Sequence, residues 1–573
     1  MSADAMIERP SQSASENPVL FWGCFLALVT TAFGFIARMF LIDTWAKEFD
    51  LDPARSGELA GIGIWPFAVS IIGFSLLIDR IGYKASMIIA FIGHITWAIM
   101  GVSAYFVSQG GDKHTGFQLL YWGSLILALG NGTVEAFINP VVATMFSRAK
   151  TKWLNILHAG WPGGLVVAGM VTIFIDHVPW WIKVGLIAAP AVGYFVMLFP
   201  MTFPVQERVS SGVSYKDMLS EFGVLGAMIV GFLITLQLIE FFSFGGALSM
   251  TEKGIFIGIG IAIVVAFGIY TQSAGRILMF GMVLIMMPLA TTEIGTDGWI
   301  TDIMKPIAEA NGFHSGWVLV YTSVIMMVLR FFAGPIVHAL SPLPLLAVSA
   351  FLAIIGLYTL SFSAGMLIFV AATLYGIGKT FFWPTMLGVV SEQTPKGGAL
   401  TLNAISGIGM LAVGVLGFPY IGTLQADKSI QALVASQEIK TALPNLVKDG
   451  KLTVVEDKNI YEIINYKALS NDKIKDQINT LPIERREGVQ KAIDNAIDES
   501  KQGALANMVI FPVIMLIGYG ILIGYFQMRG GYQQVHLDET PAPAPEPMPA
   551  AQRGTDHPHG ITEKPGPSSG IRE

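Results

Sequence analysis

The chain has 573 residues, of which 53% are hydrophobic and only 13% are charged, whereas soluble proteins usually carry about 25% charged residues. This shortage of charge indicates an integral membrane protein, and the formal net charge of −6 gives no support for nucleic-acid binding. A single cysteine, Cys24, excludes a disulfide framework and a thiolate metal site.

The N-terminal residues 1–18 are polar, and we expect them to be disordered. They contain no apolar stretch of the kind that marks a cleavable signal peptide, so the first apolar run should remain as a transmembrane helix. About 20 apolar residues are needed to cross a hydrocarbon core of ~30 Å. By that criterion the sequence predicts about fourteen spans, approximately at 19–42, 57–78, 86–107, 118–146, 154–175, 180–202, 224–247, 253–271, 277–303, 316–340, 343–363, 366–390, 400–423 and 505–528.

The spans suggest an all-α membrane protein made of two six-helix bundles. We expect an N-terminal bundle over 19–203, a linker with two extra spans over 204–276, and a C-terminal bundle over 277–528. Basic residues are more frequent in alternate short loops, which predicts that both termini are cytoplasmic.

Two polar segments lie outside this plan. Residues 424–504 interrupt the C-terminal bundle, and we interpret them as a soluble helical insert on the outer face, with helical patterns at 457–468 and 483–497. The tail, 529–573, is rich in proline, glycine and serine, so we expect it to be disordered.

An internal repeat relates the fourth span to the twelfth. Glycine, an ionisable residue and proline recur at the same offsets, as Gly132, Glu135 and Pro140 in the first copy and Gly376, Lys379 and Pro384 in the second. Each copy is followed by a loop and a Leu-Asn pair, Leu154-Asn155 or Leu402-Asn403. Both copies start on the same side of the membrane in the predicted topology, so they are parallel repeats.

Glu135 is the first candidate for function, because a charge at the bilayer centre costs roughly 2.5–3.5 kcal/mol and is seldom kept without a role. Asn131 and Asn139 lie one turn before and after it, on the same helix face. A buried carboxylate in a cavity can load and release a proton, which makes Glu135 the candidate for proton coupling. The alternative is a structural glutamate paired to a neighbouring helix.

Three intramembrane cations accompany it. Lys379, the repeat partner of Glu135, is either a counter-ion across a central cavity or a residue held among backbone carbonyls. Arg38, in the first span, is either a substrate-binding cation or an interfacial residue. Arg330, inside the tenth span, is expected either in a structural charge network or near the cytoplasmic gate, with substrate contact as a further alternative.

The ninth span adds two carboxylates, Glu293 and Asp297, which flank Gly295. Their four-residue spacing predicts a shared helix face, and the polar, glycine-containing sequence predicts a bend near a bound ligand. His158 and Trp161 are further candidates for the same cavity, whereas Glu240, in an extra span, is expected to serve helix packing.

A resemblance supports this plan. The loop Asp79-Arg80-x-Gly82-x-Lys84 resembles the cytoplasmic signature of the major facilitator superfamily. The fourth, fifth and ninth spans are similar to the fucose–galactose–glucose proton symporter group through Glu135, Asn139, Pro140, Leu154, Asn155, His158 and the stretch 292–299. The resemblance implies a major facilitator fold, a cytoplasmic gate at Asp79, Arg80, Gly82, Lys84 and Arg330, and proton-coupled sugar transport through Glu135. It also implies a bacterial inner membrane.

We therefore expect a secondary active transporter that carries a small polar solute, most simply a sugar, by proton-coupled symport. The substrate would bind through Arg38, Asn131, Asn139, His158, Glu293, Asp297 and Lys379. An organic or inorganic anion is the alternative substrate, favoured by Lys379 and by Arg38, which stands where the symporter group often has an acidic residue. Sodium is the alternative coupling ion.

A membrane sensor whose insert contacts a ligand or a protein partner is an alternative of another class. No Walker A or His-Glu-x-x-His sequence and no Cys/His cluster is present, so we expect no enzymatic activity, cofactor or metal.

Overall fold

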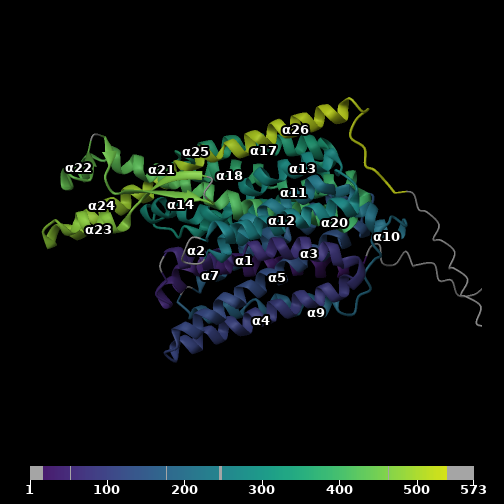
Figure 1. Cartoon of the computed structure of the whole chain (residues 1–573), viewed down its shortest axis with the longest axis horizontal. Helices are drawn as coiled ribbons and strands as arrows, with labels where there is room; N and C mark the ends of the chain where they lie inside the picture. Colours follow the sequence, from purple (N-terminus) through teal and green to yellow (C-terminus); the bar gives the residue numbers. More distant parts are fainter. Residues whose placement is uncertain are drawn as a thin grey trace, which may run out of the picture.

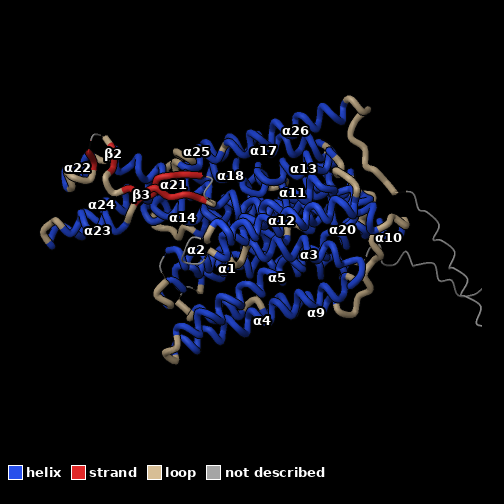
Figure 2. Tube along the Cα trace, viewed as in Figure 1, coloured by secondary structure: helices blue, strands red, loops and turns tan. Residues whose placement is uncertain are grey.

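The computed structural model describes residues 17–51, 53–175, 177–243, 248–448, 450–461 and 464–537. Long helices make up most of it (Figures 1 and 2). Among these residues, 13 helices are long and apolar enough to cross a membrane, or up to 14 if one bent pair is a single span. The disorder predicted for 1–18 and 529–573 concerns mostly residues outside the described ranges, but it is wrong for Pro18, which begins α1, and for residues 532–535, which are held by hydrogen bonds.

The N-terminal half is a bundle in which α1 packs against α5, α7 and α9, while α5 also packs against α3 and α4. Its elements are α1 (Pro18–Glu48), α2 (Pro53–Gly61), α3 (Trp65–Ile81), α4 (Tyr83–Gln109), α5 (Lys113–Met145), α6 (Lys150–Leu157), α7 (Gly160–Phe174), α8 (Trp180–Gly185) and α9 (Ala188–Leu198).

The linker forms the short α10 (Glu207–Ser210) and two long helices, α11 (Tyr215–Phe242) and α12 (Met250–Thr271). α11 packs against α12, α13 and α20, and its Phe241 ring lies 5.2 Å from Trp65 of α3, so α11 contacts both halves. α12 is exposed along most of its length, as an apolar helix in lipid would be.

The C-terminal half is a second bundle, in which α17 packs against α18 and α26, and α13 packs against α20 and α26. Its elements are α13 (Ile277–Ala290), the π-helix η2 (Thr291–Gly295), α14 (Thr296–Ala310), α15 (Gly316–Phe331), α16 (Ala333–Leu340), α17 (Pro342–Leu360), α18 (Leu367–Lys379), α19 (Phe382–Gln393), η3 (Pro395–Gly397), α20 (Gly398–Ala412), the π-helix η4 (Val413–Gly417), α21 (Phe418–Ala435), α25 (Ala504–Met508) and α26 (Ile510–Gln527).

The insert has its own small hydrophobic core, which includes Leu433, Leu446, Ile474 and Ile493. It contains α22 (Gln437–Ala442), α23 (Asn471–Asn479), α24 (Ile483–Lys501) and two antiparallel hairpins, β1–β2 (Val447–Lys448 and Lys451–Leu452) and β3–β4 (Val455–Ile460 and Ile464–Leu469). The predicted helix at 483–497 lies within α24.

The helix predicted at 457–468 is wrong, because this segment forms the β3–β4 hairpin. In β4, Ile464, Tyr466 and Ala468 alternate with Asn465 and Lys467, which is the period of a strand. The membrane helix also extends beyond 424, since α21 continues to Ala435.

The insert lies at one end of the helical body, here called the insert end (Figure 1). The opposite end has α10 and the C-terminal end of α26, and is here called the terminal end.

The contacts between the two halves follow the internal repeat. α3 packs against α20, and α15 packs against α7. In the repeat, α3 corresponds to α15 and α7 corresponds to α20, so the two contacts are equivalent. The two Asn residues of the repeat also cross to the opposite half: Asn155 Nδ2 donates to Thr385 Oγ1 at 3.1 Å, and Asn403 Nδ2 donates to the Ala136 carbonyl at 2.8 Å. The repeat therefore builds the interface between the halves.

At the terminal end, α6 and α19 approach closely at Gly388. A Cβ added there would lie 2.7 Å from Thr151 Cα, so Gly388→Ala should push α6 away from α19. Overpacking of this kind costs about 1–3 kcal/mol, so we predict that the substitution shifts the conformational equilibrium about fivefold or more toward a state open at the terminal end.

Spin labels on Arg148→Cys and Lys396→Cys, two exposed positions on opposite halves, would report this opening as a longer inter-label distance. Gly281→Ala is the matched control, because a Cβ at Gly281 meets nothing within 4 Å. Equal distance distributions for the Gly388 and Gly281 variants would contradict the prediction.

Candidate functional site

A small cavity lies between the two halves and is surrounded by four of the predicted site residues. It has a volume of about 20 Å³, room for about one water molecule. Glu135 and His158 border it from the N-terminal half, and Glu293 and Arg330 border it from the C-terminal half. All four side chains are almost completely buried. Ionisable groups from both halves therefore meet at one point in the protein interior.

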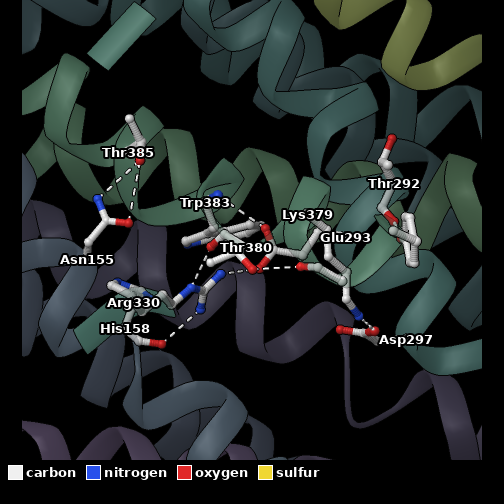
Figure 3. A network of polar contacts seen from close by, with 12 residues as sticks. Asn155, His158, Thr292, Glu293, Asp297, Arg330, Lys379, Thr380, Trp383 and Thr385 are labelled. Atoms are coloured by element: carbon white, nitrogen blue, oxygen red, sulfur yellow. Dashed lines mark hydrogen bonds and ion pairs between the residues drawn. The ribbon is translucent and has the colours of Figure 1, made fainter. Parts of the chain in front are cut away.

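Arg330, near the end of α15, connects three parts of this site (Figure 3). Its Nη2 donates to Glu293 Oε1 at 2.7 Å, its Nε to the Thr380 carbonyl at 2.6 Å, and its Nη1 to the His158 carbonyl at 2.8 Å. The second carboxylate oxygen of Glu293 accepts from the Trp383 backbone N–H at 3.1 Å. The guanidinium therefore joins η2, the α18–α19 junction and the α6–α7 junction.

Of the two places expected for Arg330, these contacts correspond to a structural charge network and not to the cytoplasmic gate. The span that contains Arg330 is broken, with a bend of 70° between α15 and α16. Because α16 continues the chain for another eight residues, Arg330 lies within the span instead of at its end.

Glu135 belongs to the same hydrogen-bonded chain. Asn139 Nδ2 donates to Glu135 Oε2 at 2.7 Å, and His158 Nε2 lies 3.0 Å from Asn139 Oδ1, which fits a protonated Nε2 in that bond. Glu135 is thus linked through Asn139 to the His158 side chain, while the backbone carbonyl of the same histidine accepts from Arg330, the partner of Glu293. Among the described residues, Glu135 takes part in no ion pair, whereas Glu293 is paired with Arg330.

A second, much larger cavity of about 990 Å³ extends to the insert end. Its walls include the ends of α1, α11 and α14, much of α2, and the loop before α15. Asp297 borders it and forms a buried ion pair with Lys379, whose ammonium also lies 5.2 Å from the Tyr375 ring centre. Asp297 Oδ2 is buried and has no hydrogen-bond partner in the described part of the chain.

Glu293 and Asp297 are both buried, but each has its own cation partner, Arg330 and Lys379 respectively (Figure 3). The predicted bend takes the form of the π-helix η2, whose wider turn displaces residues four apart from a common α-helical face. Lys379 pairs within its own half, so it is not a counter-ion to Glu135 across the cavity.

Two predicted substrate residues lie elsewhere. Arg38 is buried, and it donates to Ser124 Oγ at 3.3 Å, to the Ala60 carbonyl at 3.1 Å and to the Leu59 carbonyl. It therefore fixes the C-terminal end of α2, where a cation is favourable. Asn131 accepts from His94 Nε2 at 2.9 Å inside the N-terminal half, since eight residues of helix separate it from Asn139 and rotate it away.

The terminal end is closed by contacts between α6 and α19. Glu392 accepts from Thr151 Oγ1 at 2.5 Å and from the Thr151 backbone N–H at 3.2 Å, and Lys150 Nζ donates to the Ser391 carbonyl at 3.4 Å. Glu392 thus caps the N-terminal end of α6, where a negative charge is favourable. The structure is closed at the terminal end and hollow at the insert end.

The signature loop lies at this closed end, but its contacts are with the linker and its own half. Asp79 is ion-paired with Arg208, and Arg80 lies 5.0 Å from the Tyr215 ring centre. Lys84 lies 5.2 Å from the Phe199 ring centre, and Gly82 has a φ of 81° that favours glycine. A gate at these residues would pair them with the C-terminal half. Among the described residues, Asp79, Arg80 and Lys84 form no ion pair with that half.

Trp161, which was expected to face the same cavity as His158, borders the small cavity, and its buried Nε1 has no hydrogen-bond partner among the described residues. Two other residues were not predicted from the sequence: His94 holds Asn131, and Glu392 closes the terminal end. A lone histidine in an apolar span was the one signal that could have pointed to His94. The role of Glu392 depends on packing between distant segments.

No protein-family model and no curated protein matches this sequence. Solved structures do match it. The crystal structure of FucP, the fucose:proton symporter of E. coli and a major facilitator superfamily transporter, in the outward conformation, has 16% identity, covers 72% of this chain and 93% of its own, and gives a TM-score of 0.50.

Two further structures are slightly less similar. The E. coli proton:xylose symporter XylE, bound to 6-bromo-6-deoxy-D-glucose, has 14% identity over 70% of this chain and 88% of its own, with a TM-score of 0.49. The human organic anion transporter TETRAN has 11% identity over 72% and 93%, with a TM-score of 0.49. The likeness to FucP confirms the predicted major facilitator fold.

Removal of one partner from the buried Arg330–Glu293 pair should be strongly destabilising. Arg330→Met would leave the Glu293 carboxylate buried without its cation, and we predict a loss of about 3–5 kcal/mol in the free energy of unfolding. The double variant Arg330→Met/Glu293→Gln should lose less, because no unpaired charge remains. Thermal unfolding of the purified protein in detergent would measure both.

Lys113→Met is the control, since it breaks an exposed ion pair, with Asp50 at 2.7 Å, which should be worth less than about 1 kcal/mol. A loss for Arg330→Met as small as that for Lys113→Met would contradict the assignment.

Proposed function

We propose that this protein is a secondary active transporter that moves a neutral, polyhydroxylated solute such as a sugar together with a proton. The observation on which the proposal rests is a chain of contacts between the halves of a major facilitator fold: Glu135 is hydrogen-bonded through Asn139 to the His158 side chain, and the His158 backbone carbonyl accepts from Arg330, which is paired with Glu293. Such a chain can couple a proton site in one half to the position of the other half.

Glu135 is the proposed proton carrier. A buried carboxyl group without a cation partner costs less free energy when it is neutral, whereas Glu293 and Asp297 each have a cation beside them. Neutralising Glu135 would also weaken its bond with Asn139 and thereby alter the path through His158 to Arg330. Protonation would then favour a different packing of the two halves.

The charges around the large cavity support a neutral solute over an anion. The cavity is bordered by the carboxylates of Asp43, Glu58, Glu240 and Asp297, with Lys305 as a cation. Arg38 and Lys379, which suggested an anion substrate, are engaged by backbone carbonyls and by Asp297. The unpartnered acceptor oxygen Asp297 Oδ2 suits a hydroxyl group, which can donate to it.

Transport would proceed by alternating access, with the insert end outside and the terminal end in the cytoplasm. Solute enters the large cavity and reaches Asp297 while the contacts of Thr151 and Lys150 with α19 keep the inner side closed. Protonation of Glu135 and occupation of the site then allow those contacts to separate. One bundle rocks against the other around the fixed central site. In this orientation both termini would be cytoplasmic. The proposed location is a bacterial inner membrane, which the chain would cross many times.

Proteoliposomes that contain a pH-sensitive dye would test the proposal. Fucose, xylose, glucose, succinate and phosphate are added outside, and internal acidification is followed for wild type and Glu135→Gln. We predict acidification with at least one sugar and with neither anion. Glu135→Gln should lose at least about 100-fold of the acidification rate, because its amide cannot carry the proton.

Glu252→Gln is the control, because Glu252 is an exposed carboxylate that caps α12 and a glutamine can replace it there. Acidification with succinate or phosphate, but with none of the sugars, would mean that the transported solute is an anion and not a sugar. Labelled sugar uptake that needs sodium and leaves the pH unchanged would mean that the coupling ion is sodium and not the proton.

A further inference from the structure

The linker helix α11 and the insert, which are both additional to the two six-helix bundles, meet at the mouth of the large cavity. From α11, Gln237, Glu240 and Phe241 border the cavity, and from the insert, Tyr461 does. Glu240 is exposed and not packed between helices, so the expectation that it serves helix packing is wrong. The extra helix and the insert therefore form part of the wall of the large cavity.

The β3–β4 hairpin brings Tyr461 to this position. At the base of the hairpin, Val455 and Leu469 pack against the core of the insert. At its tip, Tyr461 packs against the core of the membrane helices. The two strands are six residues long, which corresponds to a reach of about 20 Å. The hairpin is thus anchored in the insert and ends in the cavity wall.

The groups gathered here can bind a hydroxylated solute. Gln237 and Glu240 lie three residues apart and share a face of α11. Burial, and then the nearby Glu240 charge, raises the pKa of Tyr461, so its phenol keeps its proton and can donate a hydrogen bond. Tyr461 also has a φ of 54°, an unfavourable backbone conformation for a tyrosine, of the kind that clusters at ligand sites.

We propose that Tyr461, Glu240 and Gln237 form an outer subsite that binds the transported sugar at the mouth of the cavity before it reaches Asp297. The Tyr461 phenol donates to a solute hydroxyl, and the Glu240 carboxylate and Gln237 amide accept from or donate to others. This subsite deepens the proposed function and rests on it. It gives the insert and α11 one shared role, the capture and selection of solute.

The test compares the kinetics of labelled fucose and xylose uptake into proteoliposomes. Tyr461→Phe and Glu240→Gln should each raise the KM of the transported sugar about three- to tenfold, with kcat nearly unchanged, because each loses a hydrogen bond made before the transport step. Tyr466→Phe is the matched control on the same hairpin, since Tyr466 does not border the cavity. Asp297→Asn should lower kcat.

The outcomes separate the subsite from the function it depends on. If wild type transports a sugar and Tyr461→Phe and Glu240→Gln both keep its KM, the subsite is overturned while the transporter stands. If wild type transports neither fucose nor xylose and the dye assay shows no other solute, both fall. A raised KM in both variants, with wild-type values for Tyr466→Phe, supports the subsite.

A separate observation concerns the segment that follows α26, residues 532–535. Tyr532 Oη donates to Glu392 Oε2 at 2.7 Å, and the Val535 backbone N–H donates to the Glu392 carbonyl at 2.9 Å. Gln534 Nε2 donates to the Ser147 carbonyl, in the opposite half, at 2.6 Å. The segment therefore crosses the closed seam between the halves, and it contacts the same Glu392 that caps α6.

We infer that residues 532–535 act as a strap that favours the conformation closed at the terminal end. The Ser147 and Glu392 contacts lie on opposite halves, so separation of the halves must break one set. Burial and the charge of Glu392 raise the pKa of Tyr532, which keeps its phenol a donor.

The double variant Tyr532→Phe/Gln534→Ala should shift spin labels at Arg148→Cys and Lys396→Cys toward longer distances, with a few-fold larger open population. Tyr525→Phe is the control, because Tyr525 contacts Arg529 through its ring alone, at 4.5 Å. A distance distribution equal to that of wild type would overturn the strap.

Discussion

The buried guanidinium of Arg330 is the interaction on which the rest of the site depends. A charge in the protein interior is stable only with close partners, and Arg330 takes them from Glu293, Thr380 and His158. Two of these belong to its own half and one to the other half. The position of the halves and the charge state of the centre are therefore tied to each other, which is the physical requirement for coupled transport.

The internal repeat explains how one chain builds such a centre. Duplicated helices supply Glu135 in one half and Lys379 in the other, yet the two residues have separate surroundings. Lys379 neutralises Asp297 beside the large cavity, while Glu135 has an amide as its partner. A symmetric scaffold thus holds two different polar sites, an ion pair in the C-terminal half and a carboxyl–amide pair in the N-terminal half.

Hydropathy and spacing predicted the spans, the repeat and most of the buried ionisable residues, because the cost of burying charge and backbone in lipid is visible in the sequence. The partners of those residues could not be predicted. Arg38 and Lys379 suggested an anion site until their contacts with carbonyls and Asp297 were known. The depth of Arg330 depends on a helix bend, and the β3–β4 hairpin was misread because its short apolar runs suit either period.

Labelled sugar exchange in proteoliposomes tests the central claim most directly, that Glu135 carries the proton and that solute binds elsewhere. In Glu135→Gln, we predict that exchange between sugar-loaded vesicles and labelled sugar outside continues, while a pH gradient no longer drives accumulation. Accumulation by Glu135→Gln at the wild-type level under the same pH gradient would contradict the account.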